Sequence, residues 1–378
     1  MPTSRRIRLL IVDDSRFIRM ALRSIVDGDA EIEVVGEARD GADAIALTRV
    51  LRPDIITMDL EMPEFDGLSA IKAIMAERPT PILVLSGHSR TGVWTTFQAL
   101  GCGAVDFMEK PPSLQAMDTR GIERALLEKI HHWARRPHGA PWGAVAPPPA
   151  PCEPEPPVPE SPPPPTPPRY APGPNAAAAR RTSGCDLVVV AVSTGGPNTL
   201  PLMLKAMGGP LHCPMVVAQH MPGLFTSGFA EHLALATGLD VVEGENGLPL
   251  TAGRIVIIAG GSDGEVVRAG SGLRLRQRRA GDSGIHPSGD LLFESAAKAA
   301  RLPAAVVLTG IGADGTQGAR AFADRRLPVF AQTPDTAVVW GMPSAVIDAG
   351  YASQVLDVEE IGAELGRLSG RLPPVSVE

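Results

Sequence analysis

The sequence predicts an α/β protein in which two doubly wound, parallel-sheet domains are joined by a proline-rich linker. In both halves of the chain, short β-branched runs alternate with amphipathic helical patterns, which is typical of a parallel sheet with helices on both faces. Between the halves, almost half of the 38 prolines lie between Pro137 and Pro174. We therefore expect a first domain at 5–136, a linker at 137–183 and a second domain at 184–378.

The proline-rich stretch is not expected to form a helix or a strand, because proline lacks an amide donor and clashes with helix interiors. It also holds too few bulky apolar residues to bury a core. A polyproline conformation would make it a semi-rigid spacer of about 3 Å per residue. A ligand for a proline-binding domain is the alternative interpretation, and a linker is the one we adopt.

The composition provides enough apolar residues for two cores, since 44% of the 378 residues are hydrophobic and 20% are charged. A net charge of −7 argues against a nucleic-acid-binding protein. One basic run, RLRQRRA at Arg274–Ala280, is interpreted as a solvated strand face, with contact to an acidic partner as the alternative.

Membrane and cysteine patterns place the protein in the cytoplasm. No run approaches 18 apolar residues, and the N-terminal MPTSRRIRLLIVDDS is interpreted as a strand and not as a signal peptide. The four cysteines show no framework spacing, and no Cys or His pair has the spacing of metal ligands. We therefore expect reduced thiols and no integral membrane segment.

Strands and helices are expected to alternate through the first domain. The expected strands are Ile7–Val12, Ile32–Glu37, Asp54–Asp59, Ile82–Ser86 and Ala104–Met108. The expected helices are Ser15–Val26, Gly41–Leu51, Leu68–Glu77, Gly92–Leu100 and Thr119–Arg136. Ligands of such sheets bind beyond the carboxyl ends of the strands, so we expect the site of this domain there.

Polar side chains stand at those strand ends: Asp13 and Asp14 after the first strand, Asp59 on the third, Ser86 on the fourth and Lys110 after the fifth. Three carboxylates at one edge repel each other unless a divalent cation lies among them, and hard oxygen ligands suit Mg²⁺. Asp59 would then be a nucleophile that forms an acyl phosphate, with Lys110 and the metal neutralising the transferred charge. The alternative is that each aspartate only caps the following helix. Because all of these residues stand at the same edge of the sheet, we favour a metal-binding and phosphorylation site over helix capping.

The first domain resembles the receiver domain of two-component response regulators. The resemblance is carried by LLIVDDS (9–15), ITMDLEMPEFDG (56–67), LVLSG (83–87) and DFMEKPP (106–112). It implies a flavodoxin-like fold and phosphorylation of Asp59 by a histidine kinase. It also implies Mg²⁺ held by Asp13, Asp14, Asp59 and the backbone carbonyl of Glu61, and a switch made of Ser86, Phe107 and Lys110. Lys110–Pro111 is a candidate cis peptide bond.

Three apolar runs of the second domain each lead into a reactive residue. The runs Leu187–Val192, Met215–Gln219 and Ala305–Thr309 lead to Ser193, to His220 and to a glycine-rich turn that holds Asp314. In a parallel sheet these strand ends meet at one edge, as a nucleophile, its base and the orienting carboxylate require. Taken singly, the serine could be a helix cap, the histidine a core residue and the aspartate a turn residue. Their shared placement favours a triad.

The turn VAVSTGGP (190–197) discriminates between kinds of site. It lacks the lysine of a nucleotide P-loop, and it is not the dinucleotide pattern GxGxxG. It approaches the nucleophile elbow GxSxG, except that Ala191 stands in place of the first glycine. Gly195 and Gly196 permit a tight turn whose amides could face an oxyanion near a helix N-terminus.

The second domain resembles the catalytic domain of chemotaxis protein-glutamate methylesterases, the CheB family. The resemblance is carried by AVSTGGP (191–197), VVAQHMPGLFTSGFAEHL (216–233), GDSGIHPSGDLLFESAA (281–297), VVLTGIGADGTQGA (306–319) and AQTPDTAVVWGMPSAV (331–346). It implies a Rossmann-like α/β domain that hydrolyses glutamyl methyl esters and often deamidates glutamines. Ser193 would be the nucleophile, His220 the general base and Asp314 its orienter. The Ile311 amide would supply the oxyanion hole, and Thr194 would position the His220 ring.

Together the two resemblances imply an esterase activated by phosphorylation. The unphosphorylated receiver is expected to dock over the Ser193 edge and to block it. No metal or organic cofactor is expected for the ester step. The implied partners are methylated chemoreceptors and a chemotaxis-type histidine kinase, and no nucleic acid is expected. The protein would be a cytoplasmic monomer that acts at membrane receptor arrays.

The sequence departs from the family pattern at three positions. Ala191 replaces a glycine, Ile311 a methionine and Ala313 a polar or charged residue. The Ala191 methyl is expected to shift Ser193 slightly, whereas a backbone amide at 311 donates whatever its side chain. Two rival functions are a phosphorylation-dependent scaffold with an inactive esterase domain and a DNA-binding regulator. The complete set of triad residues argues against the first rival, and the negative charge argues against the second.

Overall fold

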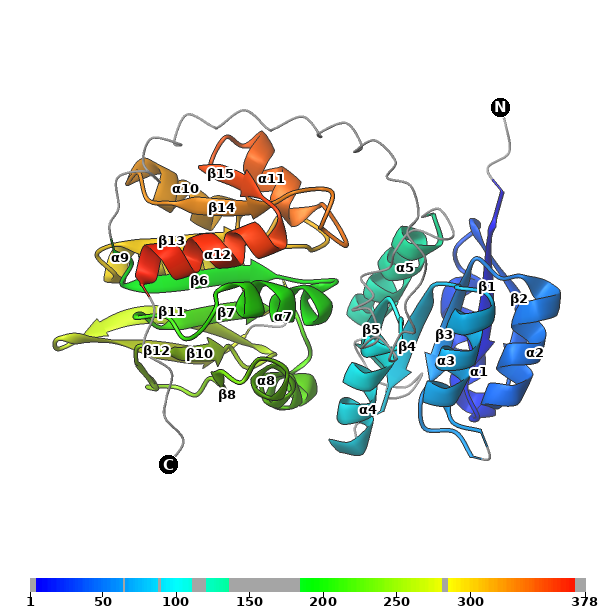
Figure 1. Ribbon diagram of the computed structural model, residues 1–378. Coiled ribbons are helices and arrows are strands. Elements are labelled where there is room, and N and C mark those ends of the chain that lie inside the picture. The colour runs from blue at the N-terminus through cyan, green and yellow to red at the C-terminus, as the bar shows by residue number, and fades with distance from the viewer. Residues whose placement is uncertain are drawn as a thin grey trace, which may run out of the picture.

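Two parallel sheets organise the chain in the computed structural model, which describes residues 5–63, 65–87, 90–110, 120–135, 184–280 and 285–370 (Figure 1). The predicted linker 137–183 lies outside these ranges. The α/β class with two parallel-sheet domains is confirmed. No helix among the described residues is long and apolar enough to cross a membrane.

The first sheet has the strand order β2-β1-β3-β4-β5, and every neighbouring pair is parallel. Its strands are β1 Ile7–Val12, β2 Ile32–Ala38, β3 Ile55–Asp59, β4 Ile82–Ser86 and β5 Asp106–Glu109. Its helices are α1 Arg16–Val26, α2 Gly41–Leu51, α3 Gly67–Glu77, α4 Arg90–Gly101 and α5 Arg120–Ala134. All residues of β3 are buried, as expected for a strand covered on both faces.

Element boundaries differ from the expectations by a few residues, for local reasons. The expected strand at Asp54 begins one residue later, because the Asp54 carboxylate accepts a hydrogen bond from the Arg8 amide at 2.9 Å. The expected strand at Ala104 begins at Asp106, because the Ala104 amide bonds back to the Ala99 carbonyl of α4. Ser15 caps α1 and is not its first residue.

The second sheet has the order β15-β14-β13-β6-β7-β10-β8 and is parallel throughout. Its strands are β6 Leu187–Val192, β7 Met215–Gln219, β8 Asp240–Glu243, β10 Arg254–Ile257, β13 Pro303–Val307, β14 Val329–Gln332 and β15 Gln354–Leu356. The chain proceeds to one side of β6 and then returns to β13 on the other side. This is the topological switch point at which open α/β sheets bind ligands.

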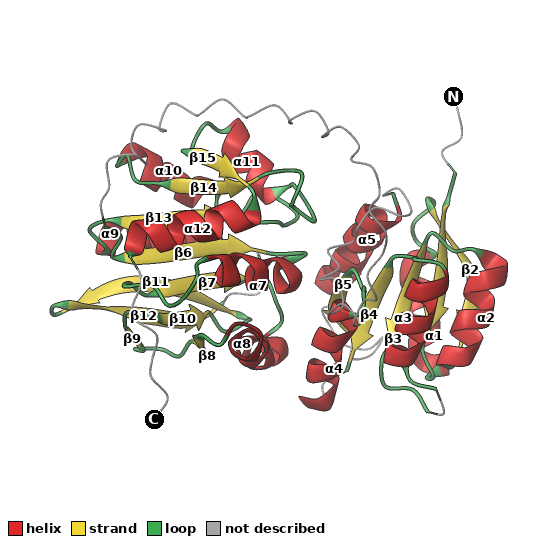
Figure 2. Cartoon of the chain, viewed as in Figure 1, coloured by secondary structure: helices red, strands yellow, loops and turns green. Residues whose placement is uncertain are grey.

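Helices cover both faces of this sheet (Figure 2). They are α7 Gly196–Ala206, α8 Gly223–Thr237, α9 Gly289–Ala299, α10 Thr316–Asp324, α11 Met342–Asp348 and α12 Val358–Ser369. Along β6, Val188, Val190 and Val192 pack with α7, α8 and α12, whereas Val189 and Ala191 pack with α9, α10 and α11. The expected strand Ala305–Thr309 ends at Val307, and Thr309 instead bonds to the loop after β6.

A small antiparallel sheet, which the sequence analysis did not predict, lies beside the second sheet. It has the order β11-β12-β9, with β9 Pro249–Leu250, β11 Ser262–Ala269 and β12 Gly272–Arg279. β11 and β12 form a hairpin closed by a two-residue turn, in which Gly270 has φ +61°. The prediction that RLRQRRA is a solvated strand face is confirmed, because its arginines lie on β12 and are exposed.

The two domains meet through α4 of the first and α8 of the second (Figure 1). Phe97 stacks on Phe229 with ring centroids 5.5 Å apart, and both rings are buried. A Cβ on Gly228 would lie 2.5 Å from Val93 Cγ1, so glycine lets the two helices approach closely. Apolar side chains of both domains therefore belong to one continuous core cluster.

Candidate functional site

The residues predicted to be phosphorylated and to bind metal gather at the carboxyl edge of the first sheet. Asp13 and Asp59 are buried and Asp14 is exposed, and one oxygen of each lies within 4.8 Å of the others. The Lys110 ammonium lies 2.9 Å from Asp13 Oδ2 and 2.7 Å from Asp59 Oδ2. The donor set of three hard carboxylates around one point fits Mg²⁺.

Burial and charge oppose each other in this group. Burial raises the pKa of Asp59 to about 6, and the Lys110 ammonium only partly offsets the rise. Burial lowers the pKa of Lys110, but the ion pairs with Asp59 and Asp13 outweigh it and hold that pKa above its usual value. Lys110 is therefore a permanent cation beside a carboxylate that is costly to ionise.

The other predicted residues of the first domain surround this group. The Glu61 amide donates to Asp59 Oδ1 at 3.1 Å, so the Glu61 backbone lies beside the predicted nucleophile. Ser86 is buried at the end of β4, and Phe107 is buried on β5. Pro111 lies outside the described residues, so the cis Lys110–Pro111 bond stays a prediction.

The three predicted triad residues stand at the carboxyl edge of the second sheet. Ser193 follows β6, His220 follows β7, and Asp314 lies between β13 and α10. His220 Nε2 lies 2.7 Å from Asp314 Oδ2. The described residues include no hydrogen bond between Ser193 Oγ and the His220 ring, and such bonds often tighten only when substrate is bound.

Asp314 is held by the N-terminus of α9. It accepts hydrogen bonds from the amides of Gly289 at 2.6 Å and Asp290 at 3.0 Å, and from the Ser288 hydroxyl at 3.3 Å. Burial alone would raise the pKa of Asp314, but the bond to His220 and these amides lower it below the usual 3.8. A permanently ionised Asp314 accepts the Nε2 proton of His220, which makes Nδ1 the basic nitrogen.

Backbone amides are available on both sides of Ser193. Among the described residues, the amides of Thr194 and Ile311 have no hydrogen-bond acceptor. Gly310 packs so closely on the nucleophile that a Cβ at this position would lie 2.8 Å from Ser193 Cβ. The Thr194 hydroxyl accepts from Lys129 Nζ at 3.4 Å, and in the described part of the chain it makes no hydrogen bond to His220.

Gln219 and Thr309, which the sequence analysis missed, tie the strand ends together. The Gln219 side-chain amide donates to the carbonyls of Ser193 at 2.9 Å and His220 at 3.1 Å. The Thr309 hydroxyl donates to the Thr194 carbonyl at 2.9 Å. Both are polar residues at the end of an apolar run and beside a predicted catalytic loop. This position in the sequence could have identified them as residues of the site.

The Ala191 methyl lies on the Asp314 side of the sheet. A Cβ added at Gly289 would lie 2.7 Å from Ala191 Cβ, and one added at Gly315 would lie 3.3 Å from it. The two glycines therefore accommodate the methyl beneath Asp314. The methyl packs within the core on the α9 face, and the expected slight shift of Ser193 stays a prediction.

A cavity of about 410 Å³ lies between the two domains at the triad. The second domain contributes Ser193, His220 and His286 to its wall, and the first domain contributes Phe107 and Lys129. The predicted switch aromatic and a lysine of α5 thus stand opposite the predicted nucleophile.

Phe107 also contacts the helix that follows His220. Its ring packs against that of Phe225 in α8, with centroids 4.8 Å apart. The Lys129 ammonium pairs with Asp106, the residue before Phe107, as well as reaching Thr194. The first domain therefore contacts the loop that carries the predicted nucleophile and the helix that follows the predicted base.

Both domains match known families. Residues 9–120 match the response regulator receiver domain, and residues 188–365 match the CheB methylesterase model. A protein-glutamate methylesterase/protein-glutamine glutaminase of Alkalilimnicola ehrlichii is 37% identical over 392 residues, covering 96% of this chain and 100% of that protein. A protein of the same name from Nocardioides sp. is 39% identical over 378 residues, covering 97% of each chain. The crystal structure of the Thermotoga maritima CheB methylesterase catalytic domain covers 49% of this chain and 99% of that chain, with 32% identity and a TM-score of 0.46.

Proposed function

The chain belongs to the family of protein-glutamate methylesterases/protein-glutamine glutaminases, and we propose that it hydrolyses glutamyl methyl esters and glutamine amides of chemoreceptors. The observation that carries this proposal is the convergence of Ser193, His220 and Asp314 at the switch point of the second sheet. The 2.7 Å bond between His220 and Asp314, beside a cavity lined by Ser193, supports the proposal that His220 is the base and Asp314 its orienter.

In the acylation step, Ser193 Oγ attacks the γ-carbonyl carbon of the ester, and His220 Nδ1 accepts the hydroxyl proton. The amides of Thr194 and Ile311 donate to the oxyanion of the tetrahedral intermediate. One such donor typically contributes ~10²–10³ in rate. The carbon–oxygen bond to the methoxy group then breaks, and the proton on His220 passes to the leaving oxygen to give methanol.

Water completes the reaction. His220 takes a proton from the water while its oxygen attacks the acyl-serine, and the proton returns to Ser193 Oγ as the glutamate carboxylate is released. A glutamine side chain follows the same route with ammonia as the leaving group. Asp314 stays ionised throughout and holds the imidazolium in place.

Control by the first domain is the second part of the proposal. The unphosphorylated domain restricts access to Ser193, because Phe107 and Lys129 form the opposite wall of the cavity. A phosphoryl group on Asp59 adds negative charge beside Lys110 and near Ser86. A movement of Phe107 in response would act directly on Phe225 of α8. A shift of a few kcal/mol is enough to move a two-state population.

Asp13, Asp14 and Asp59, with the Glu61 carbonyl, would hold Mg²⁺, and the ion would neutralise charge on the transferred phosphoryl group. The phosphodonor in this proposal is a chemotaxis-type histidine kinase. Residues 5–136 are the receiver, 137–183 the tether and 184–378 the catalytic domain. The protein acts as a cytoplasmic monomer at membrane receptor arrays and without nucleic acid.

Methanol release from methylated receptor membranes tests the proposed activity. The full chain, treated with acetyl phosphate and Mg²⁺, is expected to release methanol, and Ser193→Ala is expected to abolish the release. Ser271→Ala, in the exposed turn of the β11–β12 hairpin, is the matched control. A wild type without release would contradict the activity, and release by Ser193→Ala would contradict the triad.

A further inference from the structure

We propose that an arginine face on strand β12, formed by Arg274, Arg276 and Arg278, docks an acidic helix of the substrate beside the active site. The inference rests on the proposed function, because each turnover converts a neutral ester or amide into a carboxylate. A substrate surface that has been processed at several positions therefore carries several glutamates. A cationic surface next to the active site matches this chemistry.

The three arginines share one side of the strand. Side chains alternate between the faces of a strand, so residues two apart point the same way. Arg274, Arg276 and Arg278 are all exposed, whereas Leu275 between them is buried in the core. The hairpin therefore presents a row of guanidinium groups to solvent.

The two carboxylates on this face, Glu265 and Asp263, do not neutralise its three arginines. Glu265 lies opposite Arg276, and its Oε2 accepts from Arg276 Nε at 2.6 Å and from Arg278 at 2.7 Å. One carboxylate thus serves two guanidinium groups, while Arg274 bonds to the Gly247 carbonyl at 2.8 Å. Side-chain exposure is 11% for Glu265 but 52% and 64% for Arg276 and Arg278. The positive charge therefore faces outward.

The charge of the hairpin also contrasts with that of the chain. Residues 262–279 contain five arginines and two carboxylates, and three of these arginines and both carboxylates lie on the arginine face, whereas the whole chain has a net charge of −7. A basic segment on an acidic protein attracts acidic partners selectively, because the rest of the surface repels them.

The arginine face leads into the catalytic cavity. Asp263 lies opposite Arg278 in the hairpin, and its Oδ1 lies 3.0 Å from His286 Nδ1. His286 lines the cavity together with Ser193. A segment lying along the arginine face can therefore extend toward the nucleophile.

The spacing of the row fits a helix. Arginines two apart on a strand are about 7 Å apart along it. Glutamates four apart on a helix are about 6 Å apart along its axis. Three carboxylates at i, i+4 and i+8 can thus each approach one guanidinium group with small side-chain adjustments.

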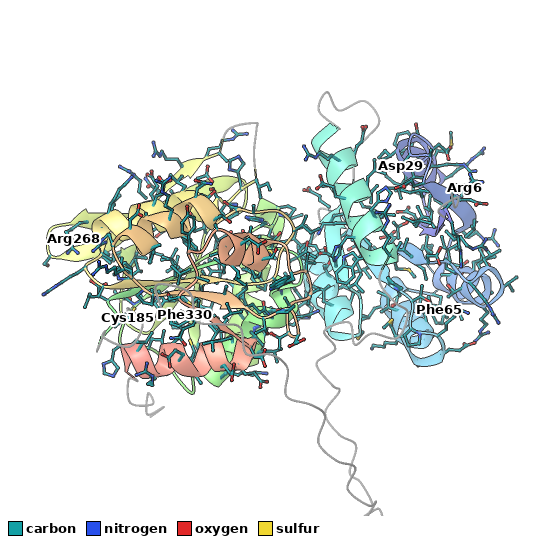
Figure 3. The ribbon with its side chains drawn as sticks, turned by 90° about the horizontal axis from the view of Figure 1, so that it is seen from above. Arg6, Asp29, Phe65, Cys185, Arg268 and Phe330 are labelled. Atoms are coloured by element: carbon teal, nitrogen blue, oxygen red, sulfur yellow. The ribbon has the colours of Figure 1, made fainter. Side chains whose placement is uncertain are left out.

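The hairpin projects on the side of the second domain that faces away from the first domain (Figure 1). Arg268, near the hairpin tip, is far from the first domain in the perpendicular view (Figure 3). Arg276 and Arg278 remain 52% and 64% exposed with the first domain in place, so the first domain does not cover the arginine face when it restricts access to Ser193. Binding of an acidic helix should be independent of phosphorylation, although hydrolysis depends on it.

Two synthetic helical peptides test the inference on the full chain. Both carry one glutamyl methyl ester at position i, with glutamates at i+4, i+8 and i+12 in the acidic peptide and alanines there in the neutral peptide. With acetyl phosphate present, the wild type should show a KM for the acidic peptide roughly three- to tenfold below that for the neutral peptide. Arg274→Gln with Arg278→Gln should remove this difference and leave kcat unchanged.

A matched control is Arg320→Gln, which removes an exposed arginine on α10. It should leave both KM values unchanged, and thermal unfolding should confirm that the double variant is folded. A milder variant, Arg274→Gln alone, should give an intermediate KM if the double variant unfolds.

Fluorescence anisotropy with an acidic peptide that carries glutamate in place of the ester should give equal Kd values with and without acetyl phosphate.

Equal KM values of wild type and the double variant for the acidic peptide would overturn the inference. A Kd that changes with phosphorylation would overturn the claim that the face is open in both states. Failure of the wild type to hydrolyse either peptide or methylated receptor membranes would instead contradict the proposed function. If the wild type hydrolyses the neutral peptide normally but has the same KM for both peptides, only the docking role of the arginine face is contradicted.

Discussion

Asp59 and Asp314 occupy comparable places at the edges of two parallel sheets, yet their surroundings shift their pKa values in opposite directions. Asp59 is buried beside Asp13 and Lys110, and its pKa rises to about 6. Asp314 is also largely buried, but the bond to His220 and the amides of α9 lower its pKa. Burial alone therefore does not decide what a strand-end carboxylate can do.

The number of hydrogen-bond donors distinguishes the two carboxylates. Asp59 accepts from the Glu61 amide and the Lys110 ammonium. Asp314 accepts from two amides at a helix N-terminus, the Ser288 hydroxyl and the His220 ring. Asp314 is thus a fixed anion that can orient a base and stabilise its protonated form. Asp59 is a carboxylate whose ionisation needs the help of neighbouring cations, as suits a group that is modified and released.

Removal of the charge on Asp314 is expected to have the largest effect. Asp314→Asn should lower kcat for methanol release by about 10³–10⁴, because a neutral amide does not stabilise the imidazolium. The assay uses the full chain with acetyl phosphate. Asp324→Asn, an exposed residue at the end of α10, should leave kcat unchanged. A decrease of less than tenfold in Asp314→Asn would contradict the assigned role.

The same Asp-to-Asn change should alter the stability of the two domains in opposite directions at pH 7. The folded state binds the Asp59 proton more tightly than the unfolded state, so this group lowers stability as pH rises from 3.8 to about 6. The rise in the Asp59 pKa from 3.8 to about 6 corresponds to about 3 kcal/mol in the free energy of unfolding. Asp59→Asn should therefore stabilise the first domain at pH 7 by up to this amount, and should have little effect below pH 4.

Asp314 contributes stability that is present above its unfolded pKa of 3.8 and is lost as pH falls below it, through the lower folded value. Asp314→Asn should accordingly destabilise the second domain at pH 7. Calorimetry of the full chain in metal-free buffer measures both changes. Shifts of the same sign in the two variants would show that the contrast between the sites is wrong.

The interface that joins the two sites can be opened from the second domain. Gly228→Leu places a side chain against Val93, where even a Cβ would come within 2.5 Å. The unphosphorylated enzyme should then release methanol about tenfold faster, as the closed state loses on the order of 1.4 kcal/mol. Gly101→Leu, where a Cβ meets no atom within 4 Å, is the control. If the unphosphorylated Gly228→Leu variant released methanol at the wild-type rate, the interface between α4 and α8 would not be what restricts the unphosphorylated enzyme.

The smallest effect is expected at Lys129. Lys129→Met removes the contacts with Asp106 and with the Thr194 hydroxyl. Only the contact with Thr194 joins the two domains, so the basal rate should rise about two- to threefold, which corresponds to about 0.5 kcal/mol, the lower end of the net contribution of one hydrogen bond. Lys72→Met, on the exposed side of α3, should have no effect. If Lys129→Met changed only the phosphorylated rate, the lysine would not stabilise the closed state.

The sequence predicted the strand-end residues because they interrupt apolar runs. Asp13, Asp59, Ser193 and His220 each follow or end a strand whose neighbours are parallel, so topology alone brings them together. Element boundaries were less predictable, as Asp54 shows: its amide donates to the Arg8 carbonyl, but its side-chain carboxylate and not a backbone carbonyl accepts the Arg8 amide.

The features that could not be predicted depend on contacts between segments far apart in the sequence. Nothing local indicates that Phe225 meets Phe107 or that Lys129 reaches Thr194, because each contact joins different domains. The room for the Ala191 methyl likewise depends on Gly289, which lies on a helix distant in the sequence. Pairwise packing between domains leaves no periodic trace in either segment.

The most direct measurement of the central claim, that the first domain restricts the triad until it is phosphorylated, compares methanol release by three samples. These are the full chain without phosphodonor, the full chain with acetyl phosphate and Mg²⁺, and residues 184–378 alone. We expect the second and third samples to be faster than the first, and the third to be insensitive to acetyl phosphate. A fragment 184–378 that is folded but no faster than the unphosphorylated full chain would contradict the account.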